Sequence, residues 1–597
     1  MKNVKRILCL VLALMMVAAL VACGPKEPTP PTTDNGTTPP TESGSASSLP
    51  SYLQVGQMPL VTEDITLRIA VVCDDVNTKP EDSWMMAFLQ EKLGIKVKLE
   101  TFYESTREEN LSLMMNDGNL PDIMIGLGFD TVKLTRYGEI GEQLLDLAPY
   151  LNEENAPNIM AVAKEYPAYL KSLTNANGQV FSIGNFSERI DNSGCLRMFY
   201  NYDIMEKAGV TKVPETLDEF VEMLRTIKKY SDANDLGIVP FGGNFANHNG
   251  TYLILNALGF NYSTGASEAC QETNIALRDG EVVLTCYDQE AFPKYLEVMH
   301  TLHSEGLMEE DFYTLEKDTT RAHLSAGKYA VFSQVPGLYG GVEFNNEWWG
   351  GVPLTSEFND TPFWPNYGYT SVGNFVVSAD TEYPELCVAL ADFFFSPDPA
   401  IHRLVNLGPS VKQEDLFLDK TTGWYWDDDP EHYGYNYAGF DADPEKYGSV
   451  LNFRTTHISP WKNLSFYAAY RETEADENLN SKLVEFVLPE TDVKEMADNN
   501  RKTYGNFNDH WQYSQNNTWG RYITDEMSPR VCYFDQETTD RIADLYTLIR
   551  DHASNEIAKF ITGKRDLSEI NDYFNELKGL GADEYVKIYA DYYAANN

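Results

Sequence analysis

Several tryptophans and tyrosines occur in polar, turn-rich stretches, where so large a side chain has little core to fill. They are Trp84, Trp348 and Trp349 in "NNEWWGG", Trp364, Tyr367 and Tyr369 in "FWPNYGYT", Trp424 and Trp426 in "GWYWDDD", Trp461 in "SPWKN", and Trp511 and Trp519 in "DHWQYSQNNTWGRY". A flat ring can stack under the apolar C–H face of a sugar while Asp, Asn, Glu or Arg side chains bind the hydroxyl rim. A loop tryptophan can equally well cover the core.

We predict that some of these rings contact a ligand, and the candidates are Trp84, Trp348, Trp349, Tyr367, Trp461 and Trp511. Trp84 is favoured because it follows the carboxyl end of the first predicted strand. Asn244 and His248 lie in a Gly- and Asn-rich loop, "GGNFANHNG", that enters a helix at Thr251. Asn244 could supply a hydrogen bond to a ligand there, although a plain loop is the simpler interpretation.

Catalytic constellations are absent from the sequence. It contains no apparent G-x-S-x-G, H-E-x-x-H, Walker or G-x-G-x-x-G pattern. A glycoside hydrolase would need two carboxylates about 5.5 Å or about 6.5–9.5 Å apart. Because the chain has 90 acidic residues, some such pair always exists and carries no information. We predict that the protein is not an enzyme and holds no cofactor.

The N-terminus has the pattern of an export signal. Lys2, Lys5 and Arg6 precede an apolar core, "ILCLVLALMMVAALVA", which is too short for a comfortable membrane span. "LVAC", ending at Cys23, resembles the bacterial lipobox, in which the cysteine is lipidated and becomes the new N-terminus. We therefore predict a signal peptide over residues 1–22 and a palmitate-type lipid anchor on Cys23. Cleavage by ordinary signal peptidase is the alternative.

The residues after Cys23 have the composition of a flexible spacer. Residues 24–48 are rich in Pro, Thr, Ser and Gly, a composition that stays disordered. We assign residues 23–58 to a lipid-anchored linker. The protein is then expected on the extracellular face of the cell membrane, held there by the lipid alone.

The charge balance excludes some partners. A formal net charge of −44 argues against nucleic acid, because phosphate binding needs a basic face. Acidity of this kind favours solubility in an exported protein, and we expect a monomer.

The scattered cysteines include no CxxC pair, which argues against structural zinc. A hairpin turning at Asp279-Gly280 would leave Cys270 out of register with Cys286, so we expect mostly free, buried thiols.

The body alternates strands and helices. "ITLRIAVVCDD", "IKVKLETFY" and "DIMIG" read as strands, and "SWMMAFLQEKLG" and "TREENLSLMMNDG" as the helices between them. This β-α-β-α-β order predicts an open parallel sheet, whose ligands bind beyond the carboxyl ends of the strands.

Six segments in order resemble the family 1 extracellular solute-binding proteins, the lipid-anchored receptors of ABC importers, and in particular their large oligosaccharide-type subgroup. The segments are "LMMNDGNLPDIMIG", "GEQLLDLAPYLNEENAPNI", "NGQVFSI", "FYNYDIMEKAGVTKVPETLDEFVEMLRTIK", "HSEGLMEEDFYTLEKDTTRAHLSAGKYAVF" and "IAKFITGKRDLSEINDYFNELKGLGADEYVKIYADYY". The similarity runs from about residue 60 to the end and thins between roughly 400 and 530. The residues in these motifs are of the kinds that pack a core or cap a helix, such as Thr216 and Glu219 in a capping box. They therefore indicate the fold and do not mark the ligand site.

The resemblance implies an α/β, two-lobed, periplasmic-binding-protein-like (type II) fold with open sheets flanked by helices and a ligand cleft between the lobes. Its expected boundaries are residues 59–198 for the first part of lobe 1, 199–372 for the first part of lobe 2, and 373–597 for the return to lobe 1 and the C-terminal helices on lobe 2. Closure of this "Venus flytrap" would bury the ligand.

The implied function is carbohydrate transport: capture of an oligosaccharide and its delivery to an ABC importer permease. A peptide receptor of the same fold and a secreted glycan-active enzyme are the alternatives, and an adhesin that feeds no transporter stays open as well.

Many large members of the family carry a calcium loop after their "DEF" helix. Here the run "SDANDLGIVP" is short and has Ile238 where a glutamate would stand, so we predict no metal.

Overall fold

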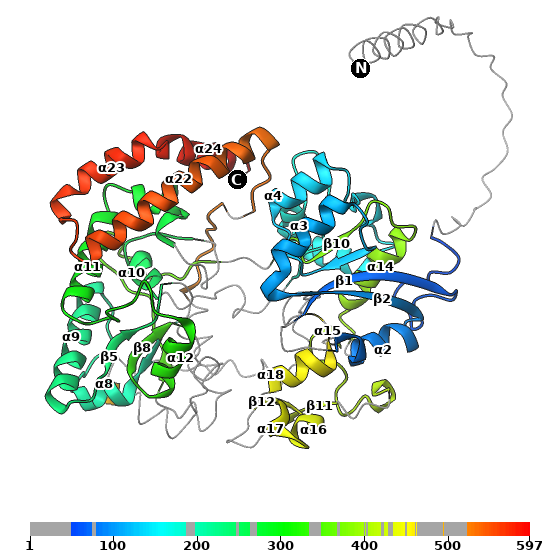
Figure 1. Ribbon diagram of the computed structural model, residues 1–597, viewed down its shortest axis with the longest axis horizontal. Coiled ribbons are helices and arrows are strands. Elements are labelled where there is room, and N and C mark those ends of the chain that lie inside the picture. Colours follow the sequence, from blue (N-terminus) through cyan, green and yellow to red (C-terminus); the bar gives the residue numbers. More distant parts are fainter. Residues whose placement is uncertain are drawn as a thin grey trace, which may run out of the picture. The chain divides into compact units, whose positions relative to one another are not determined.

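The structure is a computed structural model (Figure 1). The chain divides into two units, Met1–Ser48 and Leu49–Asn597, and every described residue lies in the second. The structure describes residues 49–73, 79–186, 198–245, 250–262, 271–333, 348–366, 370–398, 400–401, 404–418, 423–427, 434–447, 450–459, 461, 493–494, 522–529 and 531–596. The predicted signal peptide, Cys23 and most of the linker lie outside these residues.

The first sheet has the strand order β10-β3-β1-β2. Its strands are β1 (Ile65–Cys73), β2 (Ile95–Tyr103), β3 (Ile123–Ile125) and β10 (Phe375–Val377). β1 is parallel to both β2 and β3, whereas β10 pairs with β3 in the antiparallel sense. The three predicted strands and their parallel arrangement are confirmed, and β10 arrives from much later in the chain.

Helices cover both faces of this sheet, as the continuous apolar run of β1 predicts. Ile69 and Val71 belong to one buried cluster, and Ala70 and Val72 to another. The first cluster includes residues of α2 (Trp84–Glu91), α5 (Pro157–Glu165), α6 (Pro167–Leu173) and α14 (Pro384–Phe394). The second includes residues of α3 (Arg107–Asp117) and α4 (Thr131–Leu134).

The second sheet has the order β5-β8-β4-β9. Its strands are β4 (Met198–Asn201), β5 (Val239–Gly242), β8 (Tyr329–Ser333) and β9 (Trp348–Gly350). β5 and β8 are parallel, and β4 is antiparallel to both β8 and β9. All residues of β8 are buried, so this sheet is also enclosed by other elements.

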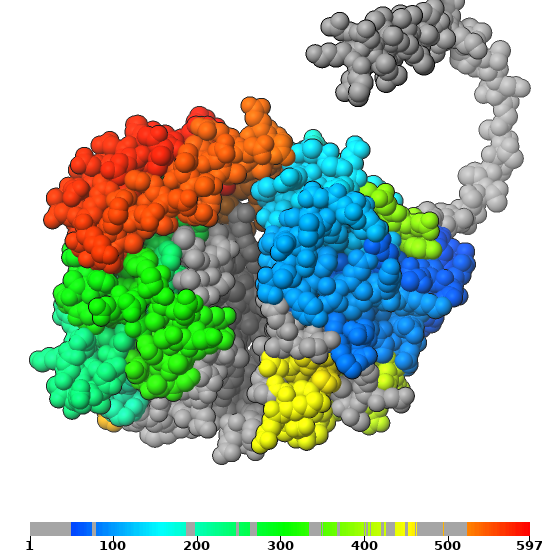
Figure 2. Space-filling view, in the orientation of Figure 1, coloured from blue at the N-terminus to red at the C-terminus, as the bar shows by residue number. Residues whose placement is uncertain are grey.

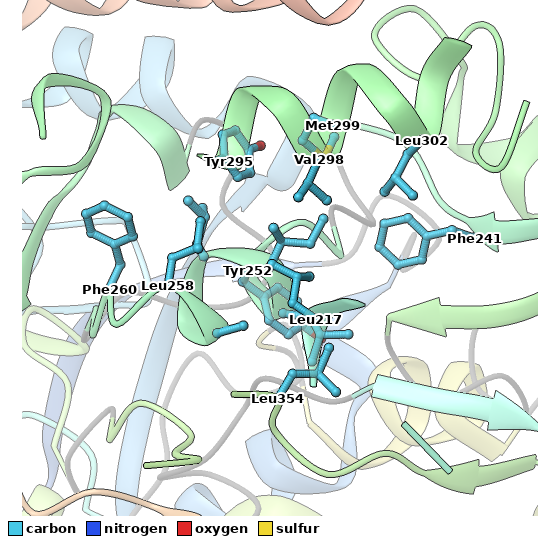
Figure 3. Packing of buried hydrophobic residues seen from close by; sticks show 14 of the residues in the cluster. Leu217, Phe241, Tyr252, Leu258, Phe260, Tyr295, Val298, Met299, Leu302 and Leu354 are labelled. Carbon is cyan, nitrogen blue, oxygen red and sulfur yellow. The ribbon is translucent and has the colours of Figure 1, made fainter. Parts of the chain in front are cut away.

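A large buried cluster surrounds the second sheet, and Figure 3 shows part of it around Tyr252, Tyr295 and Phe241. Its helices are α8 (Tyr202–Ala208), α9 (Leu217–Asn234), α10 (Tyr252–Ala257), α11 (Phe292–Ser304) and α12 (Lys317–Ser325). The chain adds α22 (Gln536–Ile561), α23 (Ile570–Gly579) and α24 (Ala582–Asn596) to the same cluster from its far end. Figure 2 shows these C-terminal helices as a continuous surface over the segment that contains α11.

Local sequence signals explain several element boundaries. The Thr216 hydroxyl accepts a hydrogen bond from the Glu219 backbone N–H at 3.2 Å, and the Glu219 carboxylate accepts one from the Thr216 N–H at 3.2 Å. The predicted capping box is therefore confirmed at the start of α9. β6 (Ile275–Arg278) and β7 (Glu281–Leu284) form the predicted hairpin around Asp279-Gly280. Both turn residues have positive φ, as a two-residue hairpin turn requires.

A smaller, aromatic-rich group of elements follows α14. It contains α15 (Leu404–Leu407), β11 (Trp424–Asp427), β12 (Gly434–Tyr437), α16 (Ala438–Asp441), α17 (Pro444–Tyr447) and α18 (Val450–Phe453). Tyr437 and Phe453 belong to the first-sheet cluster, so this group extends that core.

The described residues also include short 3-10 and π segments, namely η1 (Pro80–Asp82), η2 (Glu104–Thr106), η3 (Thr135–Ile140), η4 (Ala148–Tyr150), η5 (Gln271–Thr273), η6 (Thr285–Tyr287), η7 (Glu414–Leu416), η8 (Arg454–Ile458) and η12 (Leu567–Glu569).

The thiols agree with the sequence prediction. Cys73, Cys286, Cys387 and Cys532 are free and buried, while Cys195 and Cys270 lie outside the described residues. Burial raises the pKa of the Cys286 thiol to about 12, so the thiolate that would react is suppressed.

Candidate functional site

The carboxyl end of the first sheet is built from two adjoining segments. Because β1, β2 and β3 are parallel, their carboxyl ends meet at one edge. β3 is followed by residues 126–130, in which Gly126 and Gly128 have φ of 71° and 81°, values that suit glycine. β2 is followed directly by η2 and the start of α3. This edge is where open parallel sheets bind ligands.

Charged side chains at this edge are paired with one another. The Arg107 guanidinium lies 3.5 Å from the Glu104 carboxylate and 3.3 Å from the Glu108 carboxylate. Lys133 Nζ lies 3.0 Å from Glu108 and 3.8 Å from Asp130, and donates to the Gly128 carbonyl at 2.8 Å. Partial burial opposes ionisation of Glu108, but the contacts with Lys133 and Arg107 prevail and lower its pKa.

The carboxyl end of β5 continues into Gly243, Asn244 and Phe245. Asn244 is fully buried, and its Nδ2 donates to the Leu315 carbonyl at 2.8 Å. The Phe245 N–H donates to the Phe312 carbonyl at 2.9 Å. The Phe245 ring, which is half-buried, lies 5.1 Å from the ring of Tyr313, centroid to centroid. Two half-buried rings therefore accompany the strand end.

A carboxylate, an imidazole and a phenol meet beside the same strand. Glu309 Oε1 accepts a hydrogen bond from the Tyr329 hydroxyl at 2.6 Å and lies 2.8 Å from His323 Nδ1. Burial, and next the Glu309 carboxylate, raise the pKa of Tyr329 well above its ordinary value, so the phenol stays a donor. Glu309 directly follows Met308, which bridges Phe241 of β5. Sequence reasoning missed this group; residues from three separate segments form it, so no local motif marks it.

The structure buries four of the predicted ligand residues. Trp84 has no exposed surface, stacks on Phe88 and donates from Nε1 to the Leu416 carbonyl at 2.6 Å. Trp348 and Trp461 are 2% and 4% exposed within the two large clusters. With the buried Asn244, these side chains offer no surface to a ligand in this structure. The expectation that they bind ligand is corrected here: they are core residues.

The side chains of the remaining candidates are not described. Trp349 belongs to β9 and pairs with Tyr200 through its backbone, and nothing is described of its side chain. Tyr367, Trp511 and His248 lie outside the described residues, so their contact with a ligand stays a prediction. Phe245 and Tyr313 were missed by sequence reasoning. The sequence signal that could have pointed to them is the pair Gly242-Gly243, which marks the end of a short apolar strand just before Asn244 and Phe245.

Residues 231–240, the run "SDANDLGIVP" that stands where related proteins carry a calcium loop, form the C-terminal end of α9, the turn after it and the start of β5. Asp235 takes a left-handed conformation with φ 54°, and the Ile238 N–H donates to the Ser231 hydroxyl at 2.8 Å. The Asp232 carboxylate lies 2.5 Å from Lys228 Nζ. Among the described residues, no group of three or more His, Cys, Asp or Glu side chains could hold a metal ion. The same residues contain no helix with the length and apolarity needed to cross a membrane.

The described residues thus form two helix-covered α/β sheets with polar and aromatic side chains at strand ends. The family model of the bacterial extracellular solute-binding proteins matches residues 76–401, more than half of the chain. The chain therefore belongs to the bacterial extracellular solute-binding protein family, which confirms the predicted family and the prediction of a binding protein in place of an enzyme.

Two curated relatives are similar over part of their length. The fructooligosaccharide ABC transporter substrate-binding protein FusA of Streptococcus pneumoniae serotype 4 is 23% identical over 337 residues, which are 54% of this chain and 56% of FusA. The melibiose/raffinose/stachyose-binding protein MelE of Bacillus subtilis is 29% identical over 155 residues, 26% of this chain and 30% of MelE. The match thus spans about half of FusA and less than a third of MelE.

Solved structures share the fold. FusA of S. pneumoniae in complex with kestose superposes with a TM-score of 0.63 at 17% identity, covering 89% of this chain and 100% of that one. A human-milk-oligosaccharide (HMO) binding, ABC-transporter-associated solute-binding protein from Bifidobacterium longum infantis gives 0.67 at 17% identity, covering 89% and 99%. The predicted α/β solute-binding fold is confirmed over most of the chain.

Proposed function

We propose that this protein captures an oligosaccharide outside the cytoplasm and hands it to the permease of an ABC importer. The observation that carries the proposal is the family match over residues 76–401. The names of FusA and MelE, which are given as binding proteins for oligosaccharides, support the sugar class. The half-buried rings of Phe245 and Tyr313 beside a strand end are side chains of the type that sugars stack on.

The mechanism we propose is capture by closure of two lobes. Lobe 1 would consist of residues 59–198 and of the segment that rejoins them after residue 373. Lobe 2 would consist of residues 199–372 and of the C-terminal helices. Two observations support this division: β10 completes the first sheet after residue 373, and α22, α23 and α24 share the core of the second sheet. A ligand that contacts both lobes favours the closed form by its differential affinity.

Calorimetric titration of the full-length chain tests the function. Fructooligosaccharides, raffinose-type sugars and milk oligosaccharides would be compared with a panel of peptides, and the sugar would be recovered and checked for cleavage. We expect saturable micromolar binding of one sugar class, with the sugar returned intact. Binding of peptides alone would contradict the carbohydrate assignment, and hydrolysis of the sugar would contradict the binding-protein assignment.

Three aromatic residues remain proposed ligand contacts, namely Trp349, Tyr367 and Trp511. Replacing a stacking ring with alanine should weaken sugar binding about tenfold, equivalent to about 1.4 kcal/mol, without changing the melting temperature. Trp84→Ala is the matched comparison, because its fully buried ring predicts a large loss of stability instead.

We also propose that Cys23 carries the lipid that holds the protein at the membrane. The basic residues, apolar core and "LVAC" pattern support this proposal. Labelled palmitate should be incorporated into the wild-type chain and not into Cys23→Ala. The variant should also leave the membrane fraction. Retention of the unlabelled variant in that fraction would contradict lipid anchoring as the means of attachment.

A further inference from the structure

The chain between α11 and α12 runs beside β5 and past its end. It first follows the strand, where the Phe241 N–H donates to the Leu307 carbonyl at 2.8 Å. Residues 309–316, which we call the turn segment, then contain neither helix nor strand. At the start of this segment, the Glu309 carboxylate accepts a hydrogen bond from the Tyr329 hydroxyl at 2.6 Å. Because a turn has no ladder of its own, such cross-links fix where its side chains lie.

Two hydrogen bonds from the residues after β5 hold the rest of the turn segment. Asn244 Nδ2 donates to the Leu315 carbonyl at 2.8 Å, and the Phe245 N–H donates to the Phe312 carbonyl at 2.9 Å. Asn244 is fully buried, so its amide bond to Leu315 is formed where the local dielectric is low and the bond is strong. Asn244 and Leu315 are 71 residues apart in the sequence, and the fold alone brings them together.

The residues held in this way carry a pair of aromatic rings. The rings of Phe245 and Tyr313 lie 5.1 Å apart at an interplanar angle of 42°, and both residues are half-buried. Phe312 is 3% exposed, and its ring lies 6.3 Å from that of Phe245 and 5.4 Å from that of Tyr313. The buried ring therefore supports the two that keep exposed surface. Because Phe245 follows β5 and Tyr313 is in the turn segment, the bonds that join these stretches set the relative position of the two rings.

From this geometry we infer that Asn244 is a positioning residue for sugar binding, which holds Tyr313 against Phe245 so that the two rings form one stacking surface. This inference rests on the proposed oligosaccharide function and deepens it. Asn244 acts through the rings, because its own side chain is fully buried. A stacking ring that moves by about 1 Å loses much of its effect on binding.

The chemistry of an amide suits this role. Its N–H group donates to a carbonyl while the side chain stays neutral inside the core. Aspartate at position 244 would set an acceptor against the Leu315 carbonyl, and alanine would remove the donor altogether.

Calorimetric titration of full-length variants tests the inference. The probe is the sugar that the wild type binds most tightly among fructooligosaccharides, raffinose-type sugars and milk oligosaccharides. Tyr313→Ala and Phe245→Ala each remove one ring and should weaken binding about tenfold. Asn244→Ala should weaken binding about fivefold although both rings remain. Asn244→Ser keeps a donor on a shorter side chain, should lose less affinity, and replaces the alanine variant in every comparison if that variant does not fold.

A double-mutant cycle separates positioning from a general structural role. In a Tyr313→Ala background, Asn244→Ala should change the affinity less than about twofold, because the ring that Asn244 positions is already gone. Losses that simply multiply would show that Asn244 does not act through Tyr313, and would overturn the inference.

Asn256→Ala is the matched control. Asn256 of α10 is 1% exposed, and its Nδ2 donates to the Phe260 carbonyl at 3.1 Å. Its substitution removes the same kind of buried bond, but not one that joins β5 to the turn segment. It should lower the melting temperature about as much as Asn244→Ala does, and change the sugar affinity less than about twofold. Equal losses of affinity in the two variants would overturn the positioning role.

Two further outcomes separate this inference from the function on which it rests. A wild type that binds sugar and an Asn244→Ala variant that binds it equally well overturn the positioning role and leave the oligosaccharide receptor standing. Binding of peptides and of no sugar overturns both.

Discussion

The hydroxyl of Thr381 donates a hydrogen bond to the carboxylate of Asp122 at 2.7 Å, across 259 residues of sequence. The other oxygen of the same carboxylate accepts a hydrogen bond from the Arg68 N–H at 2.8 Å. Asp122 stands just before β3, Arg68 is in β1, and Thr381 follows β10. One side chain therefore ties together the three strands of the first sheet that come from separate parts of the chain.

Replacement of Asp122 should loosen this sheet. Asp122→Ala leaves a backbone donor without its acceptor, and we expect a loss of about 2–4 kcal/mol in the free energy of unfolding. Urea denaturation measures it. Asp64→Asn, which removes an exposed partner of Lys96, should cost less than about 1 kcal/mol. A similar cost for both variants would contradict the role given to Asp122.

Two glycines with the same backbone conformation should respond differently to alanine. Gly373 has φ 74° and Gly178 φ 80°. A Cβ on Gly373 would collide with the Phe129 carbonyl oxygen, whereas one on Gly178 meets nothing within 4 Å. Gly178→Ala should cost about 1–2 kcal/mol from left-handed strain alone, and Gly373→Ala at least about 3 kcal/mol. Equal melting temperatures for the two variants would contradict the close packing at Gly373.

The buried carboxyl of Glu272 should make stability depend on pH. Glu272 is 1% exposed, and its carboxyl accepts hydrogen bonds from Tyr295 and Thr251. The titratable groups around it are Tyr262, Tyr295, Tyr573 and Cys286. Burial raises its pKa above the ordinary value.

A raised pKa in the folded state means that the folded chain binds the proton more tightly than the unfolded chain. The resulting stability is complete below the unfolded pKa of about 4.3 and is lost as pH rises through the folded pKa. Glu272→Gln removes this loss, so its melting temperature should exceed that of the wild type at pH 8 and match it near pH 4. A wild-type advantage at pH 8 would show that Glu272 is ionised and stabilising.

Arg565 should anchor α23 to α22 more strongly than a comparable surface pair. Its guanidinium lies 2.6 Å from Glu556 and 2.9 Å from Glu576, is 5.0 Å from the Phe560 ring centroid, and its side chain is only 10% exposed. Arg541 pairs with Glu584 at 2.5 Å but is 48% exposed. We expect a cost of about 2–4 kcal/mol for Arg565→Ala and less than about 1 kcal/mol for Arg541→Ala, measured by urea denaturation.

The sequence by itself determined the local elements of this protein. Alternating and continuous apolar runs predicted β1, β2 and β3, because side-chain periodicity follows from the geometry of one strand. Thr216 and Glu219 predicted the start of α9, and Asp279-Gly280 the turn of a hairpin, because capping and turn chemistry act within a few residues. The ordered family motifs predicted the fold and the class of protein.

Only the tertiary structure decided which large side chains are buried. Trp84 directly follows a polar loop, yet its indole donates to the carbonyl of Leu416, 332 residues away. The partners at Glu309, His323 and Tyr329 also come together only when separate segments meet. Burial and pairing depend on contacts between distant parts of the chain, and a local sequence pattern carries no record of which distant part will cover it.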